Sequence, residues 1–436
     1  MMNKKKDEKI KELFNTFKKH LENNSHDNVD DEMNKTGIFS KKNFLNKIDN
    51  SNILMNKTST SFIKKKNNYY YKGQYLNKLR HGKGILYYDD GSIEYEGDFI
   101  NDIFQGNGKY IYEDGEYYIG QFFNGLKHGK GTFYYKNGNI KYEGEFYNNY
   151  RQGNGKYIYK DGDYYIGKWF NNQKHGKGII YYKDGRIQYD GEFCNDEFHG
   201  NGKLINEDGE YYIGQWFNGK AEGKGKFYYK NGNIEYDGEF HNHCYHGNGK
   251  IIYEDGEYYI GQWFNGDMHG RGILYYKNGN IKYDGEFCKG EFHGNGKLIN
   301  VNGNYYIGQW FNGKAEGKGK LYDKNGNIIY EGEFSNDSIS GNGKYIYENG
   351  EYYIGQWQFG TENGSGTLYY NNNKIKYKGE FYDGNFHGNG TFFNENGEYY
   401  IGQWFNNLKH GSGIMYNKDG TIKYEGLFIK DKYIKK

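Results

Sequence analysis

The sequence contains no proline and only three cysteines among 436 residues. Cys194, Cys244 and Cys288 are too few and too widely spaced for a disulfide framework or a four-thiolate zinc site, so we expect reduced free thiols. No apolar run of about 18 residues could cross a membrane as a helix, and the N-terminus shows no apolar signal core. We therefore expect a soluble, cytoplasmic protein.

Charge of one sign is also missing, because 58 basic residues balance 56 acidic residues to a net charge of +2. A protein with this balance has no overall attraction to nucleic acid. The sequence also lacks a Walker-type phosphate loop, a Gly-x-Ser-x-Gly elbow, an HExxH string and the protein-kinase motif set. It therefore predicts a protein that is not an enzyme, holds no cofactor or metal and does not bind nucleic acid.

Aromatic residues are abundant, at 20% of the chain and 52 tyrosines. Disordered chains are depleted in aromatic rings, so this composition favours a folded protein. Only 35% of the residues are hydrophobic, which is too little for one large apolar core. The composition predicts a thin, repetitive fold that buries tyrosine rings.

The chain is a tandem repeat. The pattern Tyr-x-Gly-x-aromatic recurs sixteen times from Gly73 to Gly426, at intervals that alternate between 24 and 23 residues, so the unit is a 47-residue double repeat. The tryptophans follow the same 47-residue period, each two residues after such an anchor glycine: Trp169, Trp216, Trp263, Trp310, Trp357 and Trp404. We expect these indole rings to pack in the core.

Two further motifs follow each of the first fifteen anchors. A Gly-x-Gly pair begins nine residues later, and an Asn-Gly or Asp-Gly pair then ends seven residues after it in fourteen of the fifteen copies. Asx-Gly between alternating segments is the strongest short-range hairpin signal. Each repeat is therefore predicted to be two strands and two turns.

The alternation between 24 and 23 residues predicts the strand register. We assign the extra residue to the Asx-Gly turn, with Asn137-Gly138 as a two-residue type I′ turn that pairs Tyr135 with Ile140, and 113–115 as a three-residue loop. Both turns place glycine opposite glycine. The resulting glycine row would let rings lie on bare backbone and let the sheet bend toward them. Its members include Gly97, Gly120, Gly131, Gly144, Gly167, Gly214, Gly225 and Gly261.

Three kinds of string resemble the MORN (membrane occupation and recognition nexus) repeat: a Tyr-x-Gly-x-Phe string such as residues 142–146, an Asn-rich turn, and a His-Gly-x-Gly string such as residues 128–131. The resemblance covers residues 69–430. It implies an all-β fold in which successive β-hairpins form an elongated, single-layer antiparallel sheet. It also implies a scaffold or targeting module at membranes and cytoskeletal structures, and a homodimer. The histidine before Gly-x-Gly is replaced in six copies, at Gln105, Gln152, Glu222, Glu316, Ser340 and Asn363.

The ends of the chain lack the repeat. Apolar residues between Ile10 and Leu21 follow helical spacing, so residues 1–22 are predicted to contain an amphipathic helix. Residues 23–68 are polar and are expected to form a disordered linker. The array of eight double repeats would then span residues 69–430, and residues 431–436 would form a lysine-rich tail.

Two candidate ligand sites were weighed. Five lysines could face acidic phospholipids, although the near-neutral net charge opposes lipid binding; they are Lys64, Lys65, Lys66, Lys127 and Lys174. Metal-ligating residue types crowd only at His241, His243, Cys244 and His246. Because that cluster occurs in one repeat only, a chance substitution is the favoured reading.

The function that we expect is a non-enzymatic MORN-repeat scaffold in the cytoplasm. It would link a membrane or membrane-associated structure to cytoskeletal or signalling partners and would form a homodimer. Two alternatives stay open. One is a phosphoinositide-binding targeting subunit that associates with a kinase, and the other is an axonemal or spoke-type structural subunit.

Overall fold

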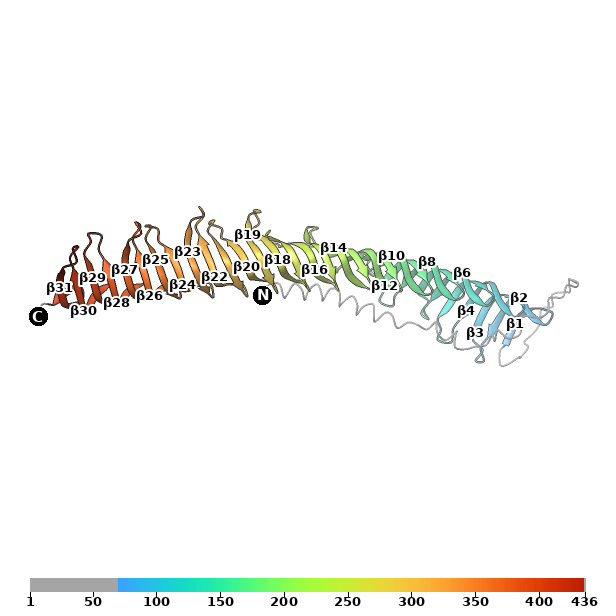
Figure 1. Ribbon diagram of the computed structural model, residues 1–436. Helices are drawn as coiled ribbons and strands as arrows, with labels where there is room; N and C mark the ends of the chain where they lie inside the picture. Colours follow the sequence, from blue (N-terminus) through green and yellow to red (C-terminus); the bar gives the residue numbers. More distant parts are fainter. Residues whose placement is uncertain (1–69, 435–436) are drawn as a thin grey trace, which may run out of the picture. The chain divides into compact units, whose positions relative to one another are not determined.

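The computed structural model describes residues 70–434, which form 32 strands and no helix (Figure 1). The expected all-β fold of successive antiparallel hairpins is confirmed. The helix expected within residues 1–22 and the linker at 23–68 lie outside the described residues. Among residues 70–434 no helix is long and apolar enough to span a membrane. The chain divides into two compact units, Met1–Cys244 and Tyr245–Lys436.

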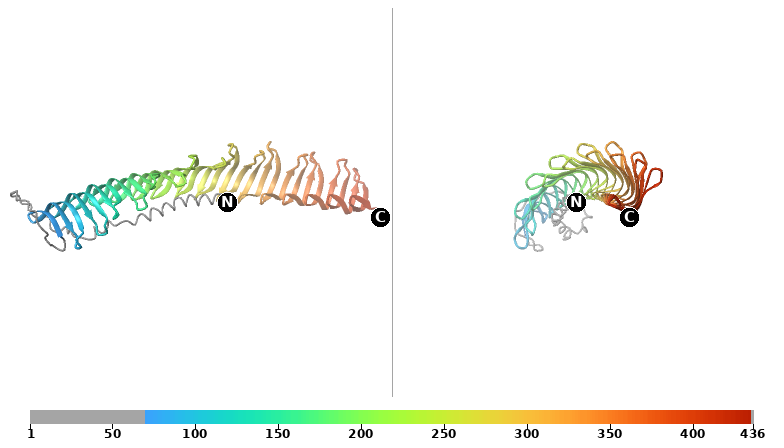
Figure 2. Two further views of the ribbon diagram at one scale, coloured as in Figure 1. Left: turned by 180° about the vertical axis from the view of Figure 1, so that it is seen from behind. Right: turned by 90° about the vertical axis from the view of Figure 1, so that its left-hand side faces the viewer.

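The first unit contains β1 to β15, and each strand pairs antiparallel with the next along the chain. Figure 2 shows this order from behind. The strands are β1 (Tyr70–Leu76), β2 (Leu79–Tyr87), β3 (Ile93–Ile100), β4 (Ile103–Ile111), β5 (Tyr117–Phe123), β6 (Leu126–Tyr134), β7 (Ile140–Tyr147), β8 (Tyr150–Ile158), β9 (Tyr164–Phe170), β10 (Gln173–Tyr181), β11 (Ile187–Cys194), β12 (Glu197–Ile205), β13 (Tyr211–Phe217), β14 (Lys220–Tyr228) and β15 (Ile234–His241).

The second unit repeats the same antiparallel hairpins from β16 to β32. The strands are β16 (Cys244–Ile252), β17 (Tyr258–Phe264), β18 (Asp267–Tyr275), β19 (Ile281–Cys288), β20 (Glu291–Ile299), β21 (Tyr305–Phe311), β22 (Lys314–Tyr322), β23 (Ile328–Ser335), β24 (Ser338–Ile346), β25 (Tyr352–Gln358), β26 (Thr361–Tyr369), β27 (Ile375–Tyr382), β28 (Asn385–Phe393), β29 (Tyr399–Phe405), β30 (Leu408–Tyr416), β31 (Ile422–Ile429) and β32 (Lys432–Ile434).

Two kinds of turn alternate along the chain, and the type I′ assignment at Asn137-Gly138 is wrong. Gly138 N–H donates to Tyr135 O and Tyr135 N–H donates to Asn139 O, both at 2.9 Å, which closes a three-residue loop. The type I′ turns lie at the opposite ends of the strands. Asn148 and Asn149, for example, have φ angles of 49° and 74°. Asparagine tolerates positive φ better than other non-glycine residues, which explains why it recurs there.

The extra residue of every second repeat is a β-bulge in the strand that follows the three-residue loop. Phe133 pairs with Tyr142, but Tyr134 pairs with Ile140, so Lys141 is left over and the expected pairing of Tyr135 with Ile140 is wrong. The bulge turns Lys141 toward the buried face beside Tyr142. There its Nζ lies 3.0 Å from Glu116 Oε2, and both side chains are largely buried. The bulge is therefore explained by the buried ion pair that it allows Lys141 to form.

The register predicted for the glycines is observed. Gly214 lies opposite Gly202 and Gly225, and the same opposition recurs along both units. A Cβ on Gly214 would touch the Tyr212 ring and lie 2.6 Å from Gly225 Cα. The phenol ring therefore rests directly on bare backbone, and its hydroxyl donates a 2.9 Å hydrogen bond to Gln215 O. No residue larger than glycine fits beneath that ring.

The core of each unit is one face of its sheet. The tyrosine two residues before an anchor glycine is no more than 1% exposed in thirteen repeats. The tryptophan two residues after the anchor is also buried, and Trp216 Nε1 donates to Gly202 O at 3.3 Å. Tyr212 and Trp216 meet edge to face, with ring centroids 5.1 Å apart. Aromatic contacts of this kind contribute about 0.5–1.5 kcal/mol beyond area burial, and here they replace an aliphatic core.

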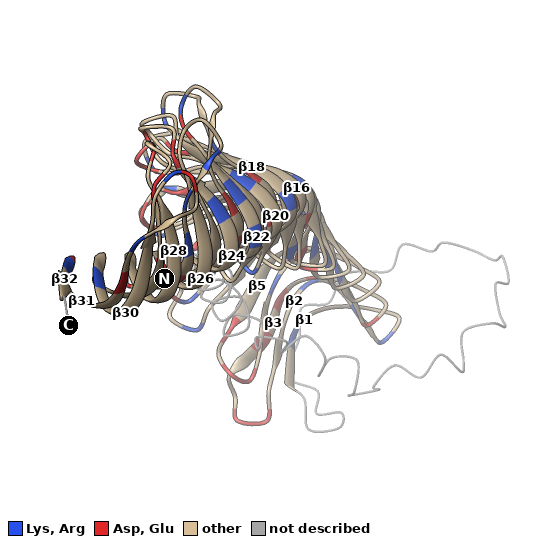
Figure 3. Cartoon of the chain, turned by 60° about the vertical axis from the view of Figure 1, so that its left-hand side comes forward, with Lys and Arg blue, Asp and Glu red and all other residues tan. Residues whose placement is uncertain are grey.

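The opposite face is solvated and carries paired charges. Lys130 faces Glu145 and Glu143 faces Lys156. In the second unit Lys320 Nζ lies 2.9 Å from Glu331 Oε1, and Figure 3 shows basic and acidic segments side by side around β18 and β22. Exposed cross-strand pairs add about 0.2–1 kcal/mol each.

Part of the expected lysine-rich tail at residues 431–436 continues the sheet. Residues Lys432–Ile434 form a short strand, β32. Phe428 of β31 pairs with Tyr433 of β32. Part of the β31 edge is therefore covered by the chain itself. The expected homodimer stays a prediction.

Candidate protein-binding surface

A row of aromatic and histidine side chains crosses the solvated face of the first unit, near the type I′ turns. We call it the ring-histidine row, and it consists of Phe123, His128, Tyr147, Phe170, His175, His199 and Phe217. Each phenylalanine or tyrosine of the row stands three residues after an anchor glycine and so points away from the buried tyrosines. Phe123 and Phe170 are each 49% exposed and Tyr147 is 57% exposed. Exposed apolar side chains that gather in this way mark interaction surfaces.

A second bulge positions each histidine. Between Gly120 and Phe122, β5 advances two residues while β6 advances four, from Lys127 to Gly131. Gly129 takes up the excess with a φ of +63°, and Gln121 Oε1 accepts a 3.1 Å hydrogen bond from the Lys130 amide. The first glycine of the Gly-x-Gly motif is therefore required by a positive φ, whereas the second lies beneath a tyrosine ring.

The bulge brings His128 between two exposed rings. Its ring centroid lies 5.6 Å from that of Phe123 and 5.1 Å from that of Tyr147. The Nδ1 atom of His128 is buried and makes no hydrogen bond, and the same holds for His199 in this unit. An unpartnered N–H is costlier to bury than a bare ring nitrogen, so we place the proton on Nε2.

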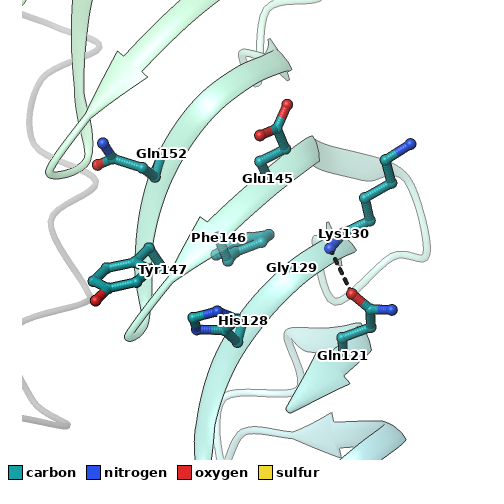
Figure 4. A pocket seen from close by; sticks show the side chains of 8 residues that line it. All are labelled: Gln121, His128, Gly129, Lys130, Glu145, Phe146, Tyr147 and Gln152. Atoms are coloured by element: carbon teal, nitrogen blue, oxygen red, sulfur yellow. Dashed lines mark hydrogen bonds between the residues drawn. The ribbon is translucent and has the colours of Figure 1, made fainter. Parts of the chain in front are cut away.

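An open hollow of ≈ 490 Å³ lies beside His128. Its lining residues come from four consecutive strands, β5 to β8, and Figure 4 shows that these strands are bent rather than flat. The lining residues are Gln121, His128, Gly129, Lys130, Glu145, Phe146, Tyr147 and Gln152. They combine two aromatic rings, Phe146 and Tyr147, with several side-chain and backbone donors, which suits a peptide better than a small charged ligand.

Two of the lysines expected to face lipid are buried in the aromatic core, so that expectation is wrong for them. Lys127 is 4% exposed and Lys174 is 7% exposed. Lys127 Nζ donates to Tyr112 Oη at 3.0 Å and lies 5.1 Å from the Phe133 ring centroid. Neither ammonium can reach a membrane surface. Lys64, Lys65 and Lys66 lie outside the described residues.

The groups around Lys174 favour the protonated, charged form of its side chain. Burial by itself would lower the pKa of this ammonium, but the Tyr159 hydroxyl and the Asp196 carboxylate outweigh burial and raise the pKa above its usual range. The Tyr159 hydroxyl accepts a 3.1 Å hydrogen bond from Nζ, and Asp196 Oδ1 lies 3.7 Å away. The Lys174 ammonium is therefore held inside the protein by its contacts with Tyr159 and Asp196.

We expect Lys174→Met, combined with Lys127→Met, to change the free energy of unfolding by less than about 1 kcal/mol. The reason is that Met268 occupies the equivalent position naturally, with the Tyr253 hydroxyl 3.8 Å from its sulfur. Urea unfolding measures the change. Vesicle co-sedimentation of the same variant should equal that of the parent chain.

Ile180→Ala, which opens a cavity at a buried aliphatic side chain, is the destabilised reference and should cost about 2–5 kcal/mol. A double lysine variant as unstable as this reference would show that the buried cations are essential to the fold. A loss of vesicle binding in that variant would restore these lysines as lipid contacts.

The histidine and cysteine cluster does not form a metal centre. His241 Nδ1 lies 2.8 Å from Glu222 Oε1, whereas His243 Nδ1 accepts a 3.1 Å hydrogen bond from the Ala221 amide. Within residues 70–434 no group of three or more histidine, cysteine, aspartate or glutamate residues could hold a metal ion. The cluster divides into two separate hydrogen-bonding roles.

The remaining predicted residues lie together on the buried face. The glycine row runs beneath the tyrosines, and the six tryptophans pack beside it. Sequence reasoning missed the ring-histidine row, although alternation counted from each anchor glycine would have placed Phe123 on the solvated face. The same alternation counted back from Gly131 places Lys127 on the buried face.

Comparison with known families agrees with the repeat geometry. The family model for the MORN repeat matches fifteen consecutive segments, at residues 71–93, 95–117, 118–140, 142–164, 165–185, 189–211, 212–234, 236–258, 259–281, 283–305, 306–328, 330–352, 353–374, 377–399 and 400–422. No curated protein matches the chain.

Matches to solved structures are remote. The E1021V mutant of the TCP10 domain of Danio rerio CPAP is 12% identical, and the match covers 58% of this chain and 95% of that chain with a TM-score of 0.17. A protein of unknown function from Bacteroides caccae is 14% identical, with 59% and 91% coverage and a TM-score of 0.13. The computationally designed Ika8 protein is 12% identical, with 84% and 95% coverage and a TM-score of 0.13.

Proposed function

Because the chain belongs to the MORN repeat family, we propose that it is a cytoplasmic scaffold that links a membrane-associated structure to cytoskeletal or signalling proteins. MORN repeats indicate a repeat scaffold and binding protein. The family is typically non-enzymatic, and we propose a non-enzymatic role for this chain. Binding would take place on the solvated faces of the sheets, since the other faces are filled by aromatic rings.

The ring-histidine row is the observation that carries this proposal. Its phenyl and phenol rings are about half exposed. In the second unit the equivalent positions are also held by exposed rings at Phe264, Phe311, Tyr382 and Phe405, whereas Ser335 and Gln358 stand at two others. The fold therefore does not need an aromatic ring there. A partner that buries these rings would gain roughly 25 cal/mol for each Å² of apolar surface removed from water.

The lipid-binding alternative is weakened, because two of its five lysines are buried. The alternative of an axonemal or spoke-type subunit differs from the proposal in the partners that it requires. The proposal and both alternatives predict different neighbouring proteins in the native cell, so identifying those neighbours distinguishes them.

Proximity labelling in the source cell tests the proposal. A labelling enzyme fused to the full chain should enrich cytoskeletal and membrane-associated proteins together, relative to the free labelling enzyme. The variant Tyr147→Ser with Phe170→Ser should lose part of that set, because it removes two exposed rings of the binding row. A labelled set equal to that of the free enzyme would contradict the scaffold, and a set confined to axonemal proteins would favour the structural-subunit alternative.

A further inference from the structure

We propose that the ring-histidine row of the first unit binds a proline-rich segment of another protein in the polyproline II conformation. The inference rests on the proposed scaffold function and names the chemistry of one of its partners. Three features support it, namely the spacing of the rings, the hydrogen-bond donors between them and the composition of this chain.

The spacing of the rings matches the polyproline II repeat. Phe123, Tyr147 and Phe170 lie on β5, β7 and β9, at the same position of alternate strands. Neighbouring strands are about 4.8 Å apart, so equivalent rings recur about every 9.6 Å. A polyproline II helix advances about 9.3 Å in one three-residue turn. Successive turns can therefore place one proline ring against each aromatic ring.

An α-helix matches this row less well. The helical repeat closest to the ring spacing is seven residues, or about 10.5 Å. This differs from the ring spacing of about 9.6 Å about three times as much as the polyproline II turn of about 9.3 Å does. The carbonyl groups of an α-helix are also used within the helix, whereas those of polyproline II are free to accept hydrogen bonds. The second difference matters because the row carries donors.

The donors lie between the rings. His128 presents its proton at Nε2, since its buried Nδ1 makes no hydrogen bond. The hollow beside it is also lined by Tyr147, which carries a hydroxyl, and by Gln152, which carries an amide. Figure 4 shows the side chains of these three residues around one opening. Exposed aromatic rings interspersed with such donors are the features by which polyproline II segments are recognised.

The composition of the chain indicates that the proline-rich segment comes from another protein. Residues 1–436 contain no proline, so no segment of these residues, in the same or in a second copy, can supply the proline rings. The charges beside the row are balanced, with Lys130 opposite Glu145. The surface therefore selects for proline rings and free carbonyls and does not require a charged partner.

Fluorescence anisotropy with the full chain tests the inference. A labelled peptide of about nine residues with repeated Ala-Pro-Pro, three turns of polyproline II, should bind at least about tenfold more tightly than a Gly-Ser peptide of equal length. Tyr147→Ser with Phe170→Ser should weaken that binding by about tenfold or more, because truncation of aromatic anchors dominates such losses.

The matched control is Ile119→Ser with Ile166→Ser. These isoleucines are 43% and 44% exposed on β5 and β9, on the same face but in a different row, so binding should stay within about twofold of the parent chain. Far-ultraviolet circular dichroism should show that both double variants keep the strand signal of the parent.

Three results would overturn the inference. They are equal affinity for the Ala-Pro-Pro and Gly-Ser peptides, undiminished binding by the folded Tyr147 and Phe170 double variant, and tighter binding of an amphipathic helical peptide. None of these results touches the proposed scaffold function, because proximity labelling detects partners of any chemistry. Labelling that finds no partner would instead remove the scaffold while the peptide titration could still succeed.

Discussion

Gly214→Val should destabilise the first unit by more than about 2 kcal/mol. The added Cβ would lie 2.6 Å from Gly225 Cα and against the Tyr212 ring, so either the ring or the paired backbone must move. Intrinsic strand preference predicts the opposite sign, since valine is a better strand residue than glycine by up to about 1 kcal/mol. Urea unfolding monitored by circular dichroism distinguishes the two predictions.

The matched control is Ile213→Val. Ile213 precedes Gly214, lies on the solvated face and is 42% exposed, so its truncation should change the free energy of unfolding by less than about 0.5 kcal/mol. Acidic residues just after an anchor glycine would be poor controls, because Glu145 accepts a hydrogen bond from the Asn154 amide. A neutral or stabilising Gly214→Val would mean that the ring does not rest on the glycine pair.

Alkaline pH should unfold the protein cooperatively between about pH 10 and pH 12. Burial raises the pKa of Tyr306, Tyr330 and Tyr400 from 10.0 to about 12. It raises the pKa of Tyr212 further. The unfolded chain therefore loses these protons at lower pH than the folded chain does. Stability is complete below about pH 10 and falls as the pH rises toward about 12, with a slope of roughly 1.4 kcal/mol per pH unit for each tyrosine that differs.

Tyrosinate absorbance and far-ultraviolet circular dichroism, recorded on one pH titration, check this expectation. The first part of the tyrosinate absorbance should appear with no loss of strand signal. The buried tyrosines should then ionise together with the loss of that signal. Ionisation of all tyrosines in one step near pH 10, with the strand signal retained, would contradict burial as the cause of the raised pKa values.

The alternation of strand residues made much of the fold predictable. Counting in steps of two from an anchor glycine such as Gly214 identifies Tyr212 and Trp216 as buried and Ile213 as solvated, as observed. The same count was available for the candidate site, where it places Phe123 in the solvent and Lys127 in the core. The expectation that Lys127 faces lipid is wrong because a charged side chain need not be exposed: the neighbours of Lys127 are rings that stabilise a cation.

The position of the extra residue could not be derived from the sequence. A residue added to the Asn137-Gly138 turn and a bulge at Lys141 give the same distance between Gly131 and Gly144, so length arithmetic cannot separate them. Alternation counted from Tyr142 puts Lys141 on the solvated face. The structure turns it inward to meet Glu116, a residue 25 positions earlier in the chain. A contact at that separation leaves no local pattern.

The sequence by itself determined the 47-residue period, the antiparallel hairpins, the opposed glycines and the membership of the family, because each depends on spacing along the chain and on the two-residue alternation of strands. Only the tertiary structure decided which turn is type I′, where the bulges fall, that Lys127 and Lys174 are buried, and that β32 covers part of β31. Bulges, ion pairs and edge pairing depend on which distant residues meet across strands. The ring-histidine row combines both levels, since alternation exposes its rings and a bulge sets His128 between them.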